Sequence, residues 1–266
     1  MIKCNMINFL IAFIKLLLLA YLTYGVLLFI NQRDLLYAPT DKTDHIFNEV
    51  IFHNDKESIN VIVVNDKKEK AILYFGGNGD TVARSAFAFD RFFPEHTVYL
   101  VNYRGYGGSS GEPTEKGIYA DALTVFDQIR SKHSDISVLG RSLGSGVATY
   151  LARKREFEKL VLITPYDSAQ SMAQERFPLY PMSILLKDKY DSVSRVKNID
   201  TKTLVILAEK DNVITMKHSQ KLIDAFPASK VDVKIIEGAG HNTILRDDRY
   251  YHVLQKFIQT HYFYTK

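Results

Sequence analysis

Hydrophobic residues are spread unevenly along the chain, and their densest run lies near the N-terminus. Residues 6–30, MINFLIAFIKLLLLAYLTYGVLLFI, carry one charged side chain, that of Lys15. About 20 apolar residues in a helix cross a bilayer, and a lysine near one end of the span can reach the headgroups. We therefore predict an N-terminal membrane anchor in residues 1–30. A cleaved signal peptide with its apolar part at 16–30 is the alternative, although the following FINQRDLLYAP is bulky or charged where a cleavage site needs small residues.

Positive charges flank this segment on both sides and give an expected orientation. Lys3, Lys15 and the terminal amine lie before or within it, and Arg33 and Lys42 follow it. Because cytoplasmic flanks carry the excess of Lys and Arg, the small difference favours a cytoplasmic N-terminus. The rest of the chain is then expected on the non-cytoplasmic side of the membrane.

From residue 31 to residue 266 the hydrophobic pattern changes to short apolar runs separated by amphipathic stretches, which predicts one domain. NEVIFHN (48–54) and SINVIVVN (58–65) alternate on either side of a turn and indicate an antiparallel hairpin. Further strands are expected at 71–75, 97–103, 136–140, 159–164, 203–208 and 231–237. Helices are expected at about 81–92, 114–132, 143–155, 214–226 and 245–261. Strands rich in Val, Ile and Leu with helices between them predict an α/β fold whose mostly parallel, eight-stranded sheet is covered on both faces.

One long connection interrupts the regular alternation of strands and helices. Residues 168–200 lie between the sixth and seventh predicted strands and are partly apolar, with two prolines. Ligands of parallel sheets bind beyond the carboxyl ends of the strands. We therefore predict a small helical cap over that edge of the sheet.

Composition excludes several classes of site. The chain is 46% hydrophobic and 24% charged, and its net charge is +4. Lysines and arginines are interspersed with acidic residues, as in NDKKEK and RKREFEK, which is typical of solvated surface and argues against a nucleic-acid partner. The single cysteine, Cys4, precedes the apolar run, so residues 31–266 contain no disulfide, cysteine zinc site or thiol nucleophile.

A glycine-rich segment, ISVLGRSLGSGVATYLARK (136–154), permits two interpretations. Its G-x-x-x-G-x-G pattern and the pair Tyr150 and Lys154 resemble a dinucleotide site of the short-chain dehydrogenase kind, with Asp167 as a ribose-binding acid. That site requires the glycine loop after the first strand. Here four predicted strands precede Gly140, and the tyrosine–lysine pair lies on the very helix that the loop begins. We therefore disfavour cofactor binding.

The same segment also contains G-x-S-x-G, the nucleophile elbow of serine hydrolases. Gly140 and Gly144 flank Ser142 at the turn from a strand into a helix, where larger side chains would clash. The serine hydroxyl lies at a helix N-terminus, whose dipole favours developing negative charge.

Two further side chains complete a possible catalytic triad. Asp211 follows the strand at 203–208, and His241 lies in the glycine loop EGAGHNTI after the last strand. The order Ser, Asp, His is that of α/β-hydrolase folds. His241 would be the general base and Asp211 would orient its imidazole; Asp167, after the preceding strand, is the alternative acid.

The tetrahedral oxyanion of such a reaction needs backbone donors. The N–H of Leu143, directly after the nucleophile, is one candidate. The loop GGNGD (76–80) follows the strand at 71–75, and we assign the N–H of Asn78 as the second donor.

The motifs GRSLGSG, NYRGYGGSSGEPTEKG, AEKDNVI and EGAGHNTI resemble signatures of the α/β-hydrolase superfamily, in particular its membrane-anchored α/β-hydrolase domain-containing proteins and their bacterial relatives. The resemblance spans essentially the whole chain, including ERFPLYPMSILLKDKYDS in the cap. It implies hydrolysis of carboxylic esters or thioesters through an acyl-enzyme, without a cofactor or metal. One departure is that Gly76, Gly77 and Asn78 stand where the family usually has His-Gly-Asn.

The resemblance and the anchor together suggest an ester substrate that is a small molecule or carries an acyl chain, next to a lipid bilayer. Tyr166 is expected in the substrate-binding pocket. Phe177, Tyr180 and Leu186 are further candidates, although internal packing of the cap is the favoured interpretation of these side chains. A peptidase or amidase with the same triad, and a catalytically silent membrane-anchored scaffold, are the alternatives. The oligomeric state is not predicted.

Overall fold

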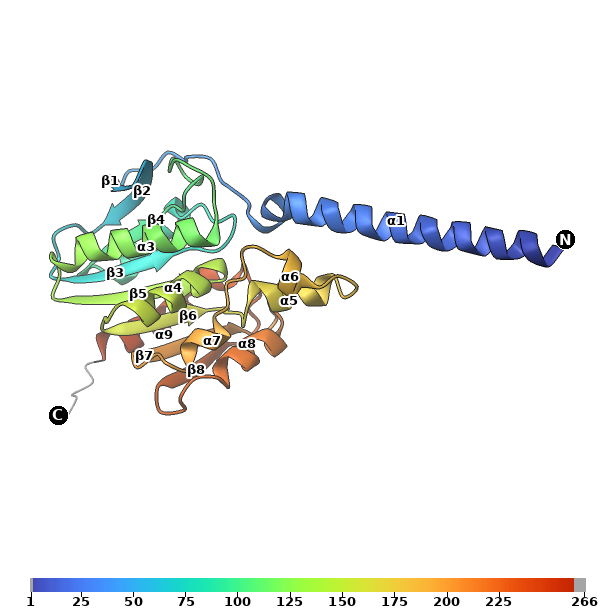
Figure 1. Cartoon of the computed structure of the whole chain (residues 1–266). Helices are drawn as coiled ribbons and strands as arrows, with labels where there is room; N and C mark the ends of the chain where they lie inside the picture. The colour runs from blue at the N-terminus through green and yellow to red at the C-terminus, as the bar shows by residue number, and fades with distance from the viewer. Residues whose placement is uncertain (1, 261–266) are drawn as a thin grey trace.

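The computed structural model describes the backbone of residues 2–260 and the side chains of residues 6–260. A single sheet with helices on both faces forms the body, and helix α1 (Ile2–Leu36) projects from it as a long rod (Figure 1). The side chains of Lys3 and Cys4, which entered the expectations on orientation and cysteine chemistry, lie outside the described part, as does residue 261 of the last predicted helix.

The sheet has eight strands in the order β1-β2-β4-β3-β5-β6-β7-β8. Their bounds are β1 Asn48–Asn54, β2 Glu57–Val64, β3 Lys70–Phe75, β4 His96–Val101, β5 Asp135–Arg141, β6 Lys159–Ile163, β7 Lys202–Ala208 and β8 Val231–Ile236. Strand β2 runs antiparallel to both its neighbours, β1 and β4, and every other pair is parallel. The predicted mostly parallel eight-stranded sheet is confirmed.

Helices cover both faces of the sheet because its strands are apolar on both sides. Helices α3 (Glu115–Arg130), α4 (Leu143–Lys154) and α8 (Met216–Ile223) pack on one face, and α2 (Ala83–Phe92) and α9 (Asp248–Gln259) on the other. The last predicted helix begins later than expected: Ile244–Arg246 form a 3₁₀ turn, and α9 starts where the Asp247 carboxylate accepts a hydrogen bond from the N–H of Arg249.

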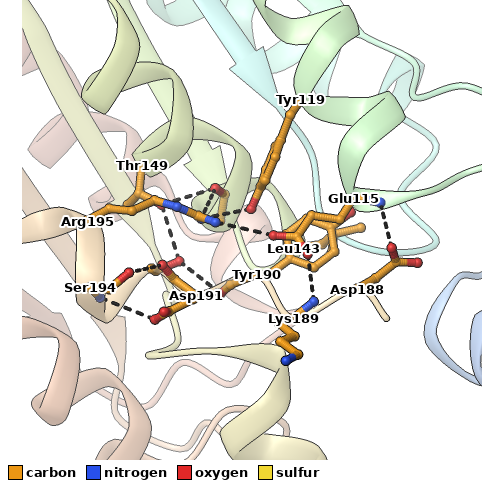
Figure 2. Close-up of polar contacts among 12 residues, drawn as sticks. Glu115, Tyr119, Leu143, Thr149, Asp188, Lys189, Tyr190, Asp191, Ser194 and Arg195 are labelled. Carbon is orange, nitrogen blue, oxygen red and sulfur yellow. Dashed lines mark hydrogen bonds and ion pairs between the residues drawn. The ribbon is translucent and has the colours of Figure 1, made fainter. Parts of the chain in front are cut away.

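The connection between β6 and β7 contains three short helices, α5 (Ala169–Arg176), α6 (Met182–Leu185) and α7 (Val193–Val196). Helices α5 and α6 lie beside the inner end of α1 (Figure 1). Residues 188–195 are held to the body by polar contacts (Figure 2): Glu115 on α3 accepts from the N–H of Lys189 and from Arg195, and its own N–H donates to Asp188. One end of the cap is therefore fixed to α3, the helix that precedes β5.

Helix α1 is exposed over most of its length. Within the described part of the chain it is the one helix long and apolar enough to cross a membrane, by length and composition. Its last turns are different, because Leu28 is buried against the cap residues Tyr180 and Met182. The apolar N-terminal segment therefore forms a helix as predicted, and this helix also packs against the cap.

Candidate active site

Ser142 lies in the turn between β5 and α4 with φ 49° and ψ −117°. This conformation is strained for a residue with a side chain. The turn is so tight that a Cβ on Gly140 would lie 2.3 Å from the carbonyl oxygen of Gly144, and one on Gly144 would lie 2.1 Å from that of Phe75. Glycine is required at both positions, as the elbow interpretation expects.

The structure brings Ser142, His241 and Asp211 together. The Nε2 of His241 is 3.0 Å from the Oγ of Ser142, and its Nδ1 is 2.7 Å from the Oδ2 of Asp211. The side chains of His241 and Asp211 are buried. Strand ends position all three groups, since Ser142 follows β5, Asp211 follows β7 and His241 follows β8. The arrangement allows a proton to pass from the serine hydroxyl to an imidazole that a carboxylate orients.

Asp211 is held in its charged form. Burial alone raises its pKa, but hydrogen bonds from His241 and from the backbone N–H groups of Ile214 and Val213 outweigh burial, so the pKa lies below the ordinary aspartate value. A carboxylate in this state can stabilise an imidazolium on His241.

Asp167, the alternative acid, contacts a different histidine. Its Oδ1 is 2.7 Å from the Nδ1 of His218 and its Oδ2 is 2.6 Å from the Nζ of Lys221. Burial raises the pKa of Asp167, but hydrogen bonds from Lys221, Ser171 and His218 have the larger opposite effect. The pKa of Asp167 therefore lies below the ordinary aspartate value. This pair lies at the base of α8, whereas His241 is paired with Asp211.

The glycine loop after β3 passes beside Ser142. A Cβ on Gly77 would lie 3.4 Å from the Cβ of Ser142, and Asn78 and Leu143 line the same cavity as Ser142. Among the residues that the structure describes, the N–H groups of Asn78 and Leu143 have no hydrogen-bond acceptor. These two donors are therefore available to a bound oxygen atom.

Arg141 is a residue of the site that the sequence analysis did not identify. Its side chain is 2% exposed. It donates to the carboxylate of Asp80 at 2.5 Å, to the carbonyl of His241 at 3.0 Å and to the amide oxygen of Asn242 at 2.8 Å. Asp80 in turn accepts from the N–H of Gly77. Burial lowers the pKa of Arg141, but the charge of Asp80 raises it to a net value above normal.

One buried guanidinium thus joins the glycine loop to the histidine loop. The available signal was a charged residue, Arg141, inside G-x-S-x-G at the end of an apolar strand.

A cavity of about 600 Å³ extends from Ser142 beneath the cap. Tyr166, Phe177 and Leu186 line it, as do Met172, Met182 and other apolar side chains of α5 and α6. Tyr166 is buried, and its hydroxyl is 3.4 Å from the carbonyl oxygen of Leu143. Tyr180 is absent from this lining and stacks instead on Tyr21 of α1. Its expected place in the pocket is therefore corrected: its ring faces the N-terminal helix.

The last turns of α1 also line the cavity, which the sequence analysis did not foresee. Leu28, Gln32, Leu35 and Leu36 form part of its wall. Apolar residues continue beyond residue 30 as Leu35 and Leu36, which was the available signal.

The residues of the dinucleotide interpretation do not form a site together. Tyr150 stacks on Tyr119 at 3.9 Å between ring centroids, and Lys154 is exposed at the end of α4. The glycine loop follows β5, in the middle of the sheet. Among residues 6–260, no group of three or more His, Cys, Asp or Glu side chains is arranged to hold a metal ion.

Comparison with known proteins gives the same fold. A family model described as alpha/beta hydrolase fold matches residues 71–189. The esterase Pf2001 of Pyrococcus furiosus superposes with a TM-score of 0.67, covering 84% of this chain and 97% of that one at 14% sequence identity. The predicted fold class is confirmed.

The relatives with similar sequences include the following two proteins. An uncharacterized protein of Mycobacterium tuberculosis is 35% identical over 178 residues, which are 65% of this chain and 63% of that protein. Human alpha/beta hydrolase domain-containing protein 17B is 28% identical over 165 residues, 60% of this chain and 56% of the human protein. The chain thus spans less than two thirds of the length of these relatives.

Proposed function

We propose that this chain, which belongs to the α/β-hydrolase superfamily, is a serine hydrolase that cleaves carboxylic ester or thioester bonds. The observation that carries the proposal is the hydrogen-bonded series from Ser142 through His241 to Asp211. Three groups in this order turn a weakly nucleophilic hydroxyl into an effective one.

In the proposed reaction, His241 takes the proton of Ser142 as its Oγ attacks the carbonyl carbon. The oxyanion that forms is stabilised by the N–H groups of Asn78 and Leu143, which have no other described acceptor. His241 then protonates the leaving alcohol or thiol, leaving an acyl-enzyme on Ser142. His241 then takes a proton from a water molecule, which attacks the acyl-enzyme. The carboxylic acid leaves, and His241 returns the proton to the Oγ of Ser142.

The lining of the cavity supports an acyl chain as the part of the substrate that is bound. Its walls are mostly apolar side chains, and its volume of about 600 Å³ is within the range of small-ligand sites. We also propose that α1 anchors the enzyme in a membrane, with the hydrolase domain on the non-cytoplasmic side. The length and hydropathy of α1 support an anchor, although a signal sequence would share them.

A fluorophosphonate probe tests the nucleophile. Wild-type protein should be labelled, Ser142→Ala should not, and Ser183→Ala, at an exposed cap serine, should be labelled like the wild type. Equal labelling of the wild type and Ser142→Ala would refute the assignment. A protein that is neither labelled nor active on nitrophenyl esters of any chain length would instead be the silent scaffold.

The bond class is tested separately with matched substrates. Nitrophenyl esters, acyl thioesters and acyl anilides of the same chain length should be compared at equal enzyme concentration. Faster turnover of the ester or thioester is expected, and preference for the anilide would favour the amidase alternative.

A further inference from the structure

The cap is attached to α1 inside the apolar stretch of that helix. Tyr180 stacks on Tyr21 with ring centroids 4.6 Å apart, and its hydroxyl donates to the carbonyl of Tyr21. The hydroxyl of Tyr21 in turn donates to the carbonyl of Leu179. Gly25 permits this approach, since a Cβ there would lie 3.1 Å from the Tyr180 ring. The loop between α5 and α6 therefore lies directly against the helix.

The position of these contacts along α1 fixes the depth of the cap. A span needs about 20 residues at 1.5 Å each, and the apolar run extends from residue 6 to residue 30. Every stretch of about 20 residues within that run includes Tyr21 and Tyr24. Both tyrosines contact Tyr180. If α1 spans a bilayer, the loop that carries Tyr180 therefore lies at the boundary of the bilayer or within it.

The exposed apolar side chains of this loop and of α6, which follows it, fit such a place. Leu179 and Ile184 are 77% and 78% exposed, among the most exposed apolar side chains outside α1. Tyrosines are enriched where membrane meets water. Beyond the loop come charged residues: Lys187 lies over the ring of Phe29, and Arg33 pairs with Asp188. The surface thus changes from apolar to charged in the direction of the body.

We propose that Leu179 and Ile184 insert into the lipid bilayer beside α1, so that the cap is a second membrane contact and the acyl chain of a lipid-embedded substrate enters the cavity from the membrane. The route is the contact between α1 and the cap. Leu28 of α1 packs with Met182 there, and both line the cavity that ends at Ser142. The entry route rests on the proposed hydrolase function and anchor, whereas the membrane contact of the loop is tested independently of catalysis.

Polar contacts also hold the cap against the last turns of α1. The side chain of Gln32 donates to the carbonyl of Leu185 and accepts from the N–H of Lys187. Asp188 accepts a hydrogen bond from Arg33 of α1. It also accepts from the N–H of Glu115 on the body (Figure 2). The anchor, the cap and the body are therefore joined within a few residues, and membrane insertion of α1 determines where the cavity opens.

Depth in the membrane is measured with one fluorophore at a time. Cys4→Ser removes the single cysteine of the full chain, and Leu179→Cys, Ile184→Cys or Ile235→Cys then carries a bimane label in phosphatidylcholine vesicles that contain lipids with a doxyl quencher on the acyl chain. Ile235 is the control, because it is 51% exposed but lies on β8, the last strand of the sheet. Strong quenching at 179 and 184 with little at 235 is expected. Equal quenching at all three positions would overturn the proposal. A label at 179 or 184 that is shielded from water but not quenched would also overturn it, because that result indicates that a second protein copy covers these positions.

Turnover tests the entry route. Ile184→Glu replaces an inserted side chain by a carboxylate, which should lower hydrolysis of nitrophenyl palmitate in vesicles at least about tenfold. Hydrolysis of water-soluble nitrophenyl acetate should be unchanged, and Ile235→Glu should resemble the wild type on both substrates. An unchanged rate on the vesicle substrate refutes entry from the membrane. A wild type inactive on both esters refutes the proposed hydrolase and with it the entry route, while the quenching result still decides whether the loop is in the membrane.

Discussion

Arg141 provides a quantitative test of how the candidate site is held together. In Arg141→Met, the carboxylate of Asp80 loses its buried partner, and the carbonyl of His241 and the amide of Asn242 lose their donor. Breaking a buried ion pair from one side destabilises a protein by about 3–5 kcal/mol. Asp80 is 21% exposed and is partly solvated, so the lower end, about 3 kcal/mol, is expected. That is a large fraction of the roughly 5–15 kcal/mol that stabilises a typical domain.

The assay is urea unfolding of wild type, Arg141→Met and the double variant Arg141→Met/Asp80→Leu. The double variant removes the unpaired carboxylate and should recover at least about 1 kcal/mol of the free energy of unfolding. A loss below about 1 kcal/mol in Arg141→Met, or no recovery in the double variant, would refute the view that an uncompensated charge is the cause.

Turnover separates positioning from stability. Arg141 joins the loop of Asn78 to the loop of His241, so both variants should lose on the order of 10²-fold in kcat under conditions where they are folded, comparable with loss of one oxyanion donor. A double variant that regained full turnover together with its stability would show that Arg141 stabilises the fold and does not position the site.

Three further outcomes are expected. Gly144→Ala places a Cβ 2.1 Å from the carbonyl oxygen of Phe75, which should destabilise the protein by about 3 kcal/mol or more in thermal unfolding; an unaffected melting temperature would contradict the tight elbow. Asp211→Asn should lower kcat for a nitrophenyl ester by about 10⁴-fold, whereas Asp167→Asn should mainly lower stability, and the reverse pattern would make Asp167 the acid. Burial, with smaller effects of Lys70 and Lys159, lowers the pKa of His96 to about 4, so between pH 6.5 and 4 the unfolded chain binds a proton that the folded chain does not. The free energy of unfolding should therefore decrease as the pH is lowered through this window, by at most about 1.4 kcal/mol per pH unit. In urea titrations His96→Phe should show a smaller decrease than the wild type, and an identical decrease in both proteins would contradict the assignment.

The sequence was sufficient to predict the strands because each is a short apolar run whose ends carry turn residues. Strands that are buried on both faces, such as β3 and β5, appear in the sequence as continuous apolar runs that are too short for a buried helix. The boundary of α9 was missed because Ile244–Arg246 continue the apolar spacing of a helix, while the Asp247 cap separates them from it. The Asp247 cap sets the start of α9, and the spacing of hydrophobic residues does not reveal where such a cap lies.

The site was predictable to the extent that it depends on strand ends. Ser142, Asp211 and His241 each follow a parallel strand, and the carboxyl ends of parallel strands meet at one edge of the sheet. Contacts between long side chains carry no such signal. The span from Arg141 to Asp80, and the stacking of Tyr180 on Tyr21, join positions whose spacing in the sequence implies nothing about contact.

The flanking glycines and the buried guanidinium of Arg141 both help to keep Ser142 in its strained conformation. A serine at φ 49° is held there only if the surrounding structure prevents relaxation. The carbonyls of Phe75 and Gly144 exclude side chains at the flanking glycines, and Arg141, adjacent to the serine in the chain, is fixed by acceptors on two other loops. Arg141 therefore couples the turn that carries Ser142 to the glycine loop and to the loop of His241. A change in either loop should consequently alter the geometry at Ser142 even when Ser142, His241 and Asp211 are all present.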